Sequence, residues 1–399
     1  MDGSSQENGR LTLLFYRFIG SKALTSTSIT AFIIFYMWIV VSRYHSVFLA
    51  GLIITIYLAV ELALAIPIGH LIDRFNNTRL NLLSSVLVLG GFGLLLFNDN
   101  LPFIYSATVI SVLGQALKID SFSAIIKKHL PEESFKKANS VNFATGSVSS
   151  LVGTVIGGFS IIYISRYFVY VIVMIAVASI FLAKPVQEKS YRPEENKMSM
   201  VGEMKSVGIF LKRIAGFLVL AFFLNGLFIS LDTYSSGLFN IVLKSTAFYY
   251  TLFSLAVPLG MISGTPIANI KYFRGDRPVF ISFLMLVFSP LIIVLSIGRS
   301  PILDILIAFA IGVILPLINI PISTKLMKAI PHSIYGKVTA VVKIFTQGAS
   351  PVMGAVFASL VIFFNIPTVL LWVGILVVPL TFYGLIIIPK FFRFSFGIS

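Results

Sequence analysis

Long apolar stretches alternate with short polar segments along the whole chain. The apolar stretches are centred near residues 28, 58, 88, 110, 150, 173, 222, 257, 288, 312, 350 and 378. Each is long enough to cross a bilayer as a helix, which takes about 20 residues. Some connections are very short and neutral, as at Asn98–Pro102 and Asn365–Pro367. The pattern predicts an all-α integral membrane protein with twelve transmembrane helices.

Composition agrees with this class and excludes others. Of the 399 residues, 57% are hydrophobic and 11% are charged, which is more apolar than a soluble core requires. The first apolar stretch lacks a cleavage site and is expected to be a retained helix. The chain has no cysteine, no HExxH and no Walker A sequence, and its four histidines fall in predicted loops or helix ends. We therefore expect no metal, no cofactor and no enzymatic activity.

The distribution of basic residues predicts the topology. Most of the 30 Lys and Arg fall in alternate loops on one side, whereas the other side receives only Arg43, Arg166, Lys244 and Arg299. By the positive-inside rule, both termini are expected in the cytoplasm, with the protein in the cell membrane. The net charge of +15 is then a topology signal and a match to anionic lipid, not a nucleic-acid surface.

The centre of the chain suggests an internal duplication. The longest hydrophilic segment, 184–213, separates residues 1–183 from 214–399, with six predicted helices in each part. A shift of 200 residues places 123–138 over 323–338. Five positions then carry the same or a similar residue: Ser123 and Ser323, Lys128 and Lys328, Pro131 and Pro331, Phe135 and Tyr335, Lys137 and Lys337. Any basic helix–loop–helix with a proline would look similar, which is the alternative explanation. The agreement favours two related six-helix bundles joined by a linker.

Ionisable and polar residues inside predicted helices are the candidates for function, because a charge at the bilayer centre costs at least ~2.5–3.5 kcal/mol. Helical spacing groups several into polar stripes. Asp120 lies about 200° round the helix from Lys118 and is expected to face elsewhere. The candidate residues of the proton or substrate pathway are Lys22 (with Thr25 and Ser26), Glu61, Lys118 (with Ser111 and Gln115), Asp120, Asn225, Asp232, Asn319 (with Gly312, Pro316 and Ser323) and Lys343.

A charged turn between the second and third predicted helices carries a resemblance to a known family. The positions Gly69, Leu71, Asp73 and Arg74, followed by Arg79, resemble the loop motif of the major facilitator superfamily. Asn76 replaces the second glycine of the motif, and we expect it to take the left-handed conformation that glycine allows. The resemblance implies two pseudo-symmetric six-helix bundles. It also implies a gating role in which Asp73 caps a helix and pairs with Arg74 or Arg79.

The fifth predicted helix carries a second resemblance. Its glycines resemble a motif of the exporters in this family, which implies close helix approach at the interface between the halves; ordinary close packing is an equal alternative. The segments Leu130–Pro131 and Ala138–Ser140 resemble the branch of enterobactin and macrolide exporters. The glycines concerned are Gly146, Gly153, Gly157 and Gly158.

The resemblance also implies where the polar stripes lie. In this family the first, fourth, seventh and tenth helices line a central cavity, and the stripes fall on those helices. The second and eleventh helices meet across the halves, so we predict an ion pair between Glu61 and Lys343, although each could instead be hydrated or pair with a neighbour. Glu61 is the first candidate for carrying a proton, followed by Asp232 and Asp120.

The sequence therefore predicts a monomeric secondary active transporter in contact with membrane lipid. The favoured function is proton-coupled efflux of hydrophobic or amphipathic small molecules. One alternative is uptake or exchange of an organic anion, which would use Lys22, Lys118 and Lys343. Another is flipping of a lysolipid or other lipid.

Overall fold

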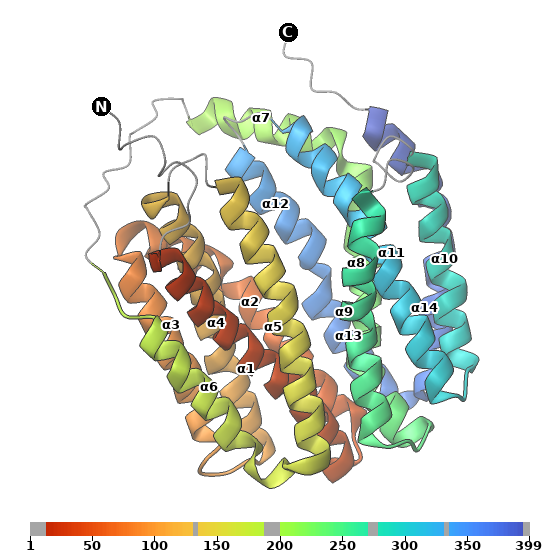
Figure 1. The fold of residues 1–399 in the computed structure, drawn as a ribbon. Coiled ribbons are helices and arrows are strands. Elements are labelled where there is room, and N and C mark those ends of the chain that lie inside the picture. The colour runs from red at the N-terminus through yellow and green to blue at the C-terminus, as the bar shows by residue number, and fades with distance from the viewer. Residues whose placement is uncertain (1–12, 131–134, 187–199, 270–277, 331–334, 394–399) are drawn as a thin grey trace, which may run out of the picture. The chain divides into compact units, whose positions relative to one another are not determined.

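The computed structural model describes residues 13–130, 135–186, 200–269, 278–330 and 335–393 (Figure 1). Within these ranges the chain is helical and contains no strand. The first half forms α1 Leu13–Tyr44, α2 Val47–Arg74, α3 Asn77–Leu94, α4 Leu101–His129, α5 Phe135–Tyr163, the 3₁₀ turn η2 Ser165–Tyr167 and α6 Phe168–Leu182. The predicted all-α class is confirmed.

The remaining helices follow in the same way. They are α7 Met200–Arg213, α8 Ala215–Gly237, the π-helical turn η3 Leu238–Val242, α9 Ala247–Asn269, α10 Pro278–Ile297, α11 Pro301–Ala329, α12 Tyr335–Gln347, α13 Ala349–Phe363 and α14 Ile366–Arg393. The eleventh predicted helix is thus α12 and α13, and α7 occupies the end of the predicted linker.

Eleven helical segments of the described chain are long and apolar enough to cross a membrane, with α12 and α13 counted as one span. The one predicted helix that is not among these eleven spans is the third, α3, which is 18 residues long and falls short of their hydropathy. Its polar residues include Asn81, Ser84 and Ser85, and all three are fully buried. The polar residues that lower the hydropathy of α3 therefore face the protein interior and not the lipid.

Cα positions divide the chain into two compact units. The first unit comprises residues 1–40 and 56–193, and the second comprises 41–55 and 194–399. The predicted domain boundaries at 183 and 214 stay a prediction.

The internal repeat is confirmed by the helix bounds. The helix α11 begins and ends 200 residues after α4, and α12 and α13 together cover the range of α5 shifted by 200. Both α4 and α11 end at an extended residue, Leu130 or Ile330, whose backbone N–H bonds to the carbonyl four residues earlier. Between α4 and α11 the repeat preserves helix length, register and the way the helix ends.

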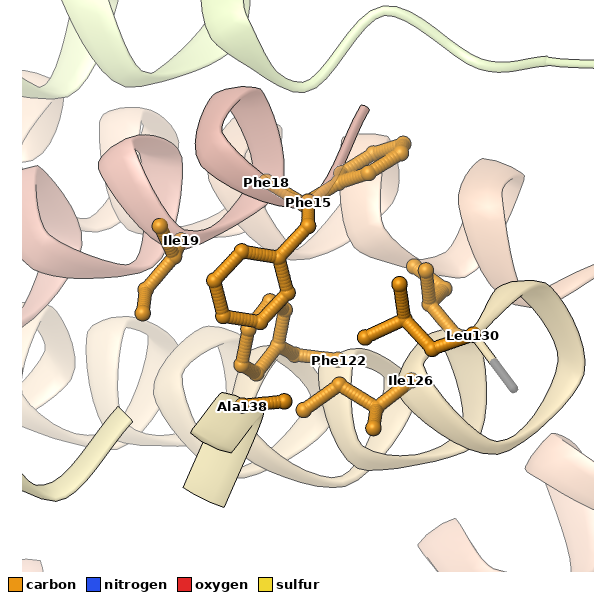
Figure 2. Packing of buried hydrophobic residues seen from close by; sticks show 8 residues of the cluster. Phe15, Phe18, Ile19, Phe122, Ile126, Leu130 and Ala138 are labelled. Carbon is orange, nitrogen blue, oxygen red and sulfur yellow. The ribbon is translucent and has the colours of Figure 1, made fainter. Parts of the chain in front are cut away.

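A cluster of buried apolar side chains fixes one end of the first unit (Figure 2). It joins the start of α1, the end of α4 and the start of α5, and its members are Phe15, Phe18, Ile19, Phe122, Ile125, Ile126, Leu130 and Ala138. Phe15 and Phe122 pack with ring centroids 5.8 Å apart. This packing sets the rotation of α1 and α4, and so determines where the polar residues one turn further along these helices point.

Candidate functional site

Among the described side chains of the first unit, Lys118 on α4 is charged and has no exposed surface. Its ammonium donates to Ser21 Oγ of α1 at 2.8 Å and to Ser85 Oγ of α3 at 2.5 Å. It also lies 2.9 Å from the backbone oxygen and 3.1 Å from Oδ1 of Asn81. We call these four oxygens the ammonium cage. All four belong to uncharged groups.

Ser179 of α6 connects the hydroxyl groups behind the ammonium cage. Its Oγ lies 2.9 Å from Thr25 Oγ1, 3.0 Å from Ser85 Oγ and 3.1 Å from Ser21 Oγ. Ser21 also donates to the Ser179 backbone oxygen at 2.9 Å, and Ser179 donates to that of Ser21 at 3.1 Å. The network therefore joins α1, α3, α4 and α6 within the first unit.

The acceptors around Lys118 favour its charged form. Each serine has one proton, and Ser21 and Ser179 each give theirs to the other's backbone oxygen, which leaves Ser85 to donate to Ser179. The Asn81 amide nitrogen points to Ser121 Oγ at 3.3 Å, so its Oδ1 faces the lysine. A neutral amine would find no donor for its lone pair here. The three N–H groups of the ammonium form can serve the two serine hydroxyls and Asn81 Oδ1, and the Asn81 backbone oxygen also accepts from Ser84 Oγ at 2.6 Å.

Close packing of α3 on α4 brings this network together. A Cβ added to Gly114 would lie 2.7 Å from the Ser84 backbone oxygen, and one added to Gly91 would lie 3.0 Å from the Ala107 oxygen. Only glycine lets the two backbones approach this closely. The approach places Asn81 and its neighbours within reach of Lys118.

A second polar group forms around Lys22 of α1, which is half-buried. Its ammonium donates to Asn142 Oδ1 of α5 at 2.5 Å and lies 5.3 Å from the centroid of the Phe122 ring. Asp120 of α4 lies close enough to interact with it electrostatically. The structure therefore brings Lys22 and Asp120 together, a pairing that helical spacing alone did not suggest.

Glu61 of α2 is half-buried in the first unit. The neighbouring Tyr57 interacts electrostatically with Glu61 and hydrogen-bonds with Gln115 of α4. Glu61 and Gln115 thus belong to one polar group between α2 and α4. The predicted pair of Glu61 with Lys343 would join the two units, and it stays a prediction.

The second unit exposes polar side chains along α8 and α11. Asn225, Asp232 and Asn319 are all exposed, as is Lys343 on α12. The amide of Asn225 bonds to the carbonyl of its own helix, Ala221 O, at 2.9 Å. These four side chains are therefore available at the surface of the second unit.

The phenol of Tyr250 lies close to Asp232. Tyr250 belongs to α9, interacts electrostatically with Asp232 and hydrogen-bonds with Ser235 and Ser254. Because the Tyr250 phenol is neutral, it does not compete with a proton or a cation for the Asp232 carboxylate.

The loop motif is described only in part. Gly69 lies within α2, but the side chains of Asp73 and Arg74 are outside the described residues. The expectation of a left-handed Asn76 is wrong: its φ is −65° and its ψ is 118°. Asn76 instead caps α3, since its Oδ1 accepts from the Arg79 backbone N–H at 2.9 Å. Asparagine suits this position because it is among the best N-cap residues.

The start of the predicted linker is attached to the same end of the first unit. Thr78 Oγ1 donates to Val186 O at 2.9 Å and lies 3.1 Å from Val186 N. An Arg17 nitrogen donates to the Lys184 carbonyl. The start of α1, the start of α3 and the segment after α6 therefore meet at one end.

Two of the four motif glycines in α5 contact α1. A Cβ on Gly153 would lie 2.6 Å from Thr27 O, and one on Gly157 would lie 2.6 Å from Ala31 O. Gly158 is buried, whereas Gly146 has open space around it. The contacts of Gly153 and Gly157 therefore serve packing inside the first unit.

Sequence reasoning selected Lys22, Lys118 and Asp120 but missed most of their partners. Asn81, Ser85 and Ser179 are single polar residues in apolar stretches, which is common in membrane helices. The spacing of Asn81 and Ser85, one turn apart on α3, was the available signal. In the described part of the chain, no group of three or more His, Asp or Glu lies close enough to hold a metal ion.

Comparison with known proteins identifies the family and the fold. The sequence profile described as Major Facilitator Superfamily matches residues 19–355. A sequence comparison with curated proteins gives no significant match. A bacterial homologue of the human lysosomal transporter Spinster, in an inward-facing and unoccupied conformation, superposes with a TM-score of 0.75 at 12% identity, covering 100% of both chains.

Two further solved structures give the same result. A nucleoside transporter matches with a TM-score of 0.75 at 12% identity, over 94% of this chain and 99% of its own. A D-xylose–proton symporter matches with a TM-score of 0.75 at 13% identity, over 96% and 99%. At such low identity these similarities establish the fold alone.

Proposed function

Because the chain belongs to the Major Facilitator Superfamily, we propose that it is a secondary active transporter that works by alternating access. We assign it proton-coupled efflux of hydrophobic or amphipathic small molecules. The enterobactin and macrolide exporter branch remains part of this proposal. The transported molecule would be neutral or cationic.

The observation that carries the proposal is Asp232. This carboxylate lies in a membrane-spanning helix, is exposed at the surface of the second unit and has a neutral phenol as its electrostatic neighbour. An acidic group at this depth is costly and is retained where it binds an ion or a substrate. A proton or an organic cation would neutralise Asp232 in turn, which is the exchange that an antiporter requires.

The first unit supplies a second set of groups for the proposed pathway. Glu61 and Asp120 are both half-buried, and Asp120 lies near the ammonium of Lys22. A carboxylate beside an ammonium remains charged more readily than one beside a phenol. We therefore place proton binding at Asp232 and Glu61 and assign Asp120 and Lys22 to substrate orientation.

Topology and location follow from the same reasoning. The start of α1, the start of α3 and residues 184–186 meet at one end of the first unit, and this end carries basic residues such as Arg17, Arg79 and Lys184. We propose that this end is cytoplasmic, with both termini on that side of the cell membrane. The gating role of Asp73, Arg74 and Arg79 and a monomeric state are part of this proposal.

Transport in liposomes containing the purified protein tests the role of Asp232. Asp232→Asn keeps the shape of the side chain but cannot take up a proton. We expect it to abolish accumulation of an amphipathic cation driven by a pH gradient, and also to weaken exchange of labelled for unlabelled cation at equal pH, because proton and cation would share this carboxylate. Ser359→Ala is the matched control and should retain both activities, because Ser359 of α13 is exposed and bonds to the carbonyl of its own helix, Ala355 O, at 2.9 Å. Gradient-driven accumulation at the wild-type rate in Asp232→Asn would overturn the assignment.

Exchange of an organic anion is the second candidate, and the exposed Lys343 favours it. In that case anions would be transported without proton movement. Lys343→Gln and Lys22→Gln would then reduce transport, and Asp232→Asn would leave it unchanged.

A further inference from the structure

We propose that the ammonium cage is a binding site for a monovalent, hydrogen-bond-donating cation, and that the chain fills this site with its own Lys118 ammonium. The cage consists of Ser21 Oγ, Ser85 Oγ and the two oxygens of Asn81. The proposal does not depend on the substrate or on the proton coupling proposed above.

The geometry is that of a cation site built from neutral oxygens. Four oxygens from α1 and α3 surround the nitrogen at 2.5–3.1 Å, which is the range of charge-assisted hydrogen bonds and ordinary N–H···O bonds. Divalent ions in proteins are usually bound with the help of carboxylates, whereas the cage oxygens belong to hydroxyl and amide groups. The site therefore suits a cation of single charge.

The cage is arranged independently of the lysine stem. Ser21 and Ser85 are oriented by Ser179 of α6, and Asn81 is oriented by Ser121 of α4. Lysine contributes only the central cation and the chain that carries it. Removing the ammonium would leave Ser21 Oγ, Ser85 Oγ and Asn81 Oδ1 without this donor, which is costly in a membrane interior, whereas the Asn81 backbone oxygen would keep its bond from Ser84 Oγ.

The second half of the chain shows that the backbone position itself does not require lysine. By the 200-residue repeat, Lys118 corresponds to Ile318 of α11, which is 4% exposed and equally part of a helix interior. An apolar side chain thus fits this place in the fold. The lysine is explained by the cage on the neighbouring helices.

The consequence is that the first unit carries a tethered cation. The ammonium joins α1, α3 and α4 permanently, and Ser179 adds α6. We therefore expect the stability of the wild-type protein to be independent of which monovalent cation is in solution.

Chemical rescue tests the proposal in the purified full-length protein. Lys118→Ala retains Cβ, and the missing atoms correspond to n-propylammonium. We expect the melting temperature of Lys118→Ala to rise with n-propylammonium concentration and to level off at saturation, as binding to the folded state requires. Ammonium should give a smaller rise, and choline, which has no N–H, should give none at equal ionic strength.

Three controls separate cation binding from other effects. The ammonium of Lys22 is half-buried and lies outside the cage. Neither the wild type nor Lys22→Ala should therefore show a shift in melting temperature that is specific to n-propylammonium. 1-Propanol has nearly the same shape without the charge and should rescue Lys118→Ala much less. Equal rescue by propanol, or no rescue by any alkylammonium, would overturn the proposal.

Lys118→Met decides the question if Lys118→Ala does not fold in any of these salts. Methionine fills a similar volume but offers neither charge nor donor. A melting temperature clearly below that of the wild type supports a need for the cation. A melting temperature equal to the wild type shows that the oxygens do not need one and refutes the proposal.

Discussion

Ser179 is the hydroxyl group that holds the network behind Lys118 in place, and replacing it with alanine gives a measurable cost. The substitution removes one donated bond, to the Ser21 backbone oxygen, and two accepted bonds, from Thr25 and Ser85. Hydrogen bonds between membrane helices contribute on average about 0.6 kcal/mol each. Three such bonds predict a loss of about 2 kcal/mol in the free energy of unfolding, or about 30-fold in the unfolding equilibrium.

The assay is reversible unfolding of the purified protein by dodecyl sulfate in mixed micelles, followed by helical circular dichroism. Ser123→Ala is the matched control. Ser123 lies on α4, is exposed and bonds only to the carbonyl of its own helix, Ile119 O, at 3.0 Å. We expect its free energy of unfolding to stay within about 0.5 kcal/mol of the wild type.

A double-mutant cycle makes the test specific to the network. Without Ser179, the Ser85 proton loses the acceptor that holds it away from Lys118, so the Ser85 lone pair is less firmly directed at the ammonium and the cage loses part of its attraction for the cation. Ser179→Ala and Lys118→Met should therefore be coupled by at least about 0.5 kcal/mol. Additive effects, or a Ser179→Ala cost no larger than that of Ser123→Ala, would refute the reasoning.

Two further predictions concern helix packing and capping. Gly157→Leu should strongly reduce the yield of folded protein, because a Cβ there would lie 2.6 Å from Ala31 O; Gly146→Leu, which meets open space, should be tolerated in the same expression and size-exclusion assay. Asn76→Ala should lower stability by about 1 kcal/mol, because the Arg79 N–H loses its cap, whereas Asn76→Asp should restore most of it in dodecyl sulfate unfolding. An alanine variant as stable as the wild type would show that the cap contributes nothing.

The sequence predicted the class, the helices and the repeat because these depend on local pattern. Apolar stretches of membrane length define the helices, and the agreement of 123–138 with 323–338 predicted that α4 and α11 would have corresponding bounds. The helices and the repeat can both be predicted without knowing how one helix is rotated against another. They follow from bilayer thickness and from the duplication.

The partners of the charged residues could not be predicted in the same way. Helical spacing separated Asp120 from Lys118 on α4, but the position of Asp120 near Lys22 depends on the rotation of α1 against α4. That rotation is set by packing such as that of Phe15 on Phe122. A one-dimensional pattern does not contain it.

Asn76 illustrates a different limit. The motif suggested a glycine-like conformation, whereas the residue is extended and caps α3. Asparagine is favoured both in left-handed turns and at N-caps, so the residue type alone does not distinguish them. The observed start of α3 at Asn77 decides between the two.

Proton movement by the wild-type protein tests the central claim most directly. Liposomes containing the protein and a pH-sensitive dye are placed under an imposed pH gradient, and amphipathic cations, neutral amphipaths, organic anions and lysolipids are added in turn. The account predicts that a cationic or neutral amphipath dissipates the gradient in protein-containing liposomes and not in empty ones. Transport of anions or lipids alone, with the gradient unchanged, would contradict proton-coupled efflux.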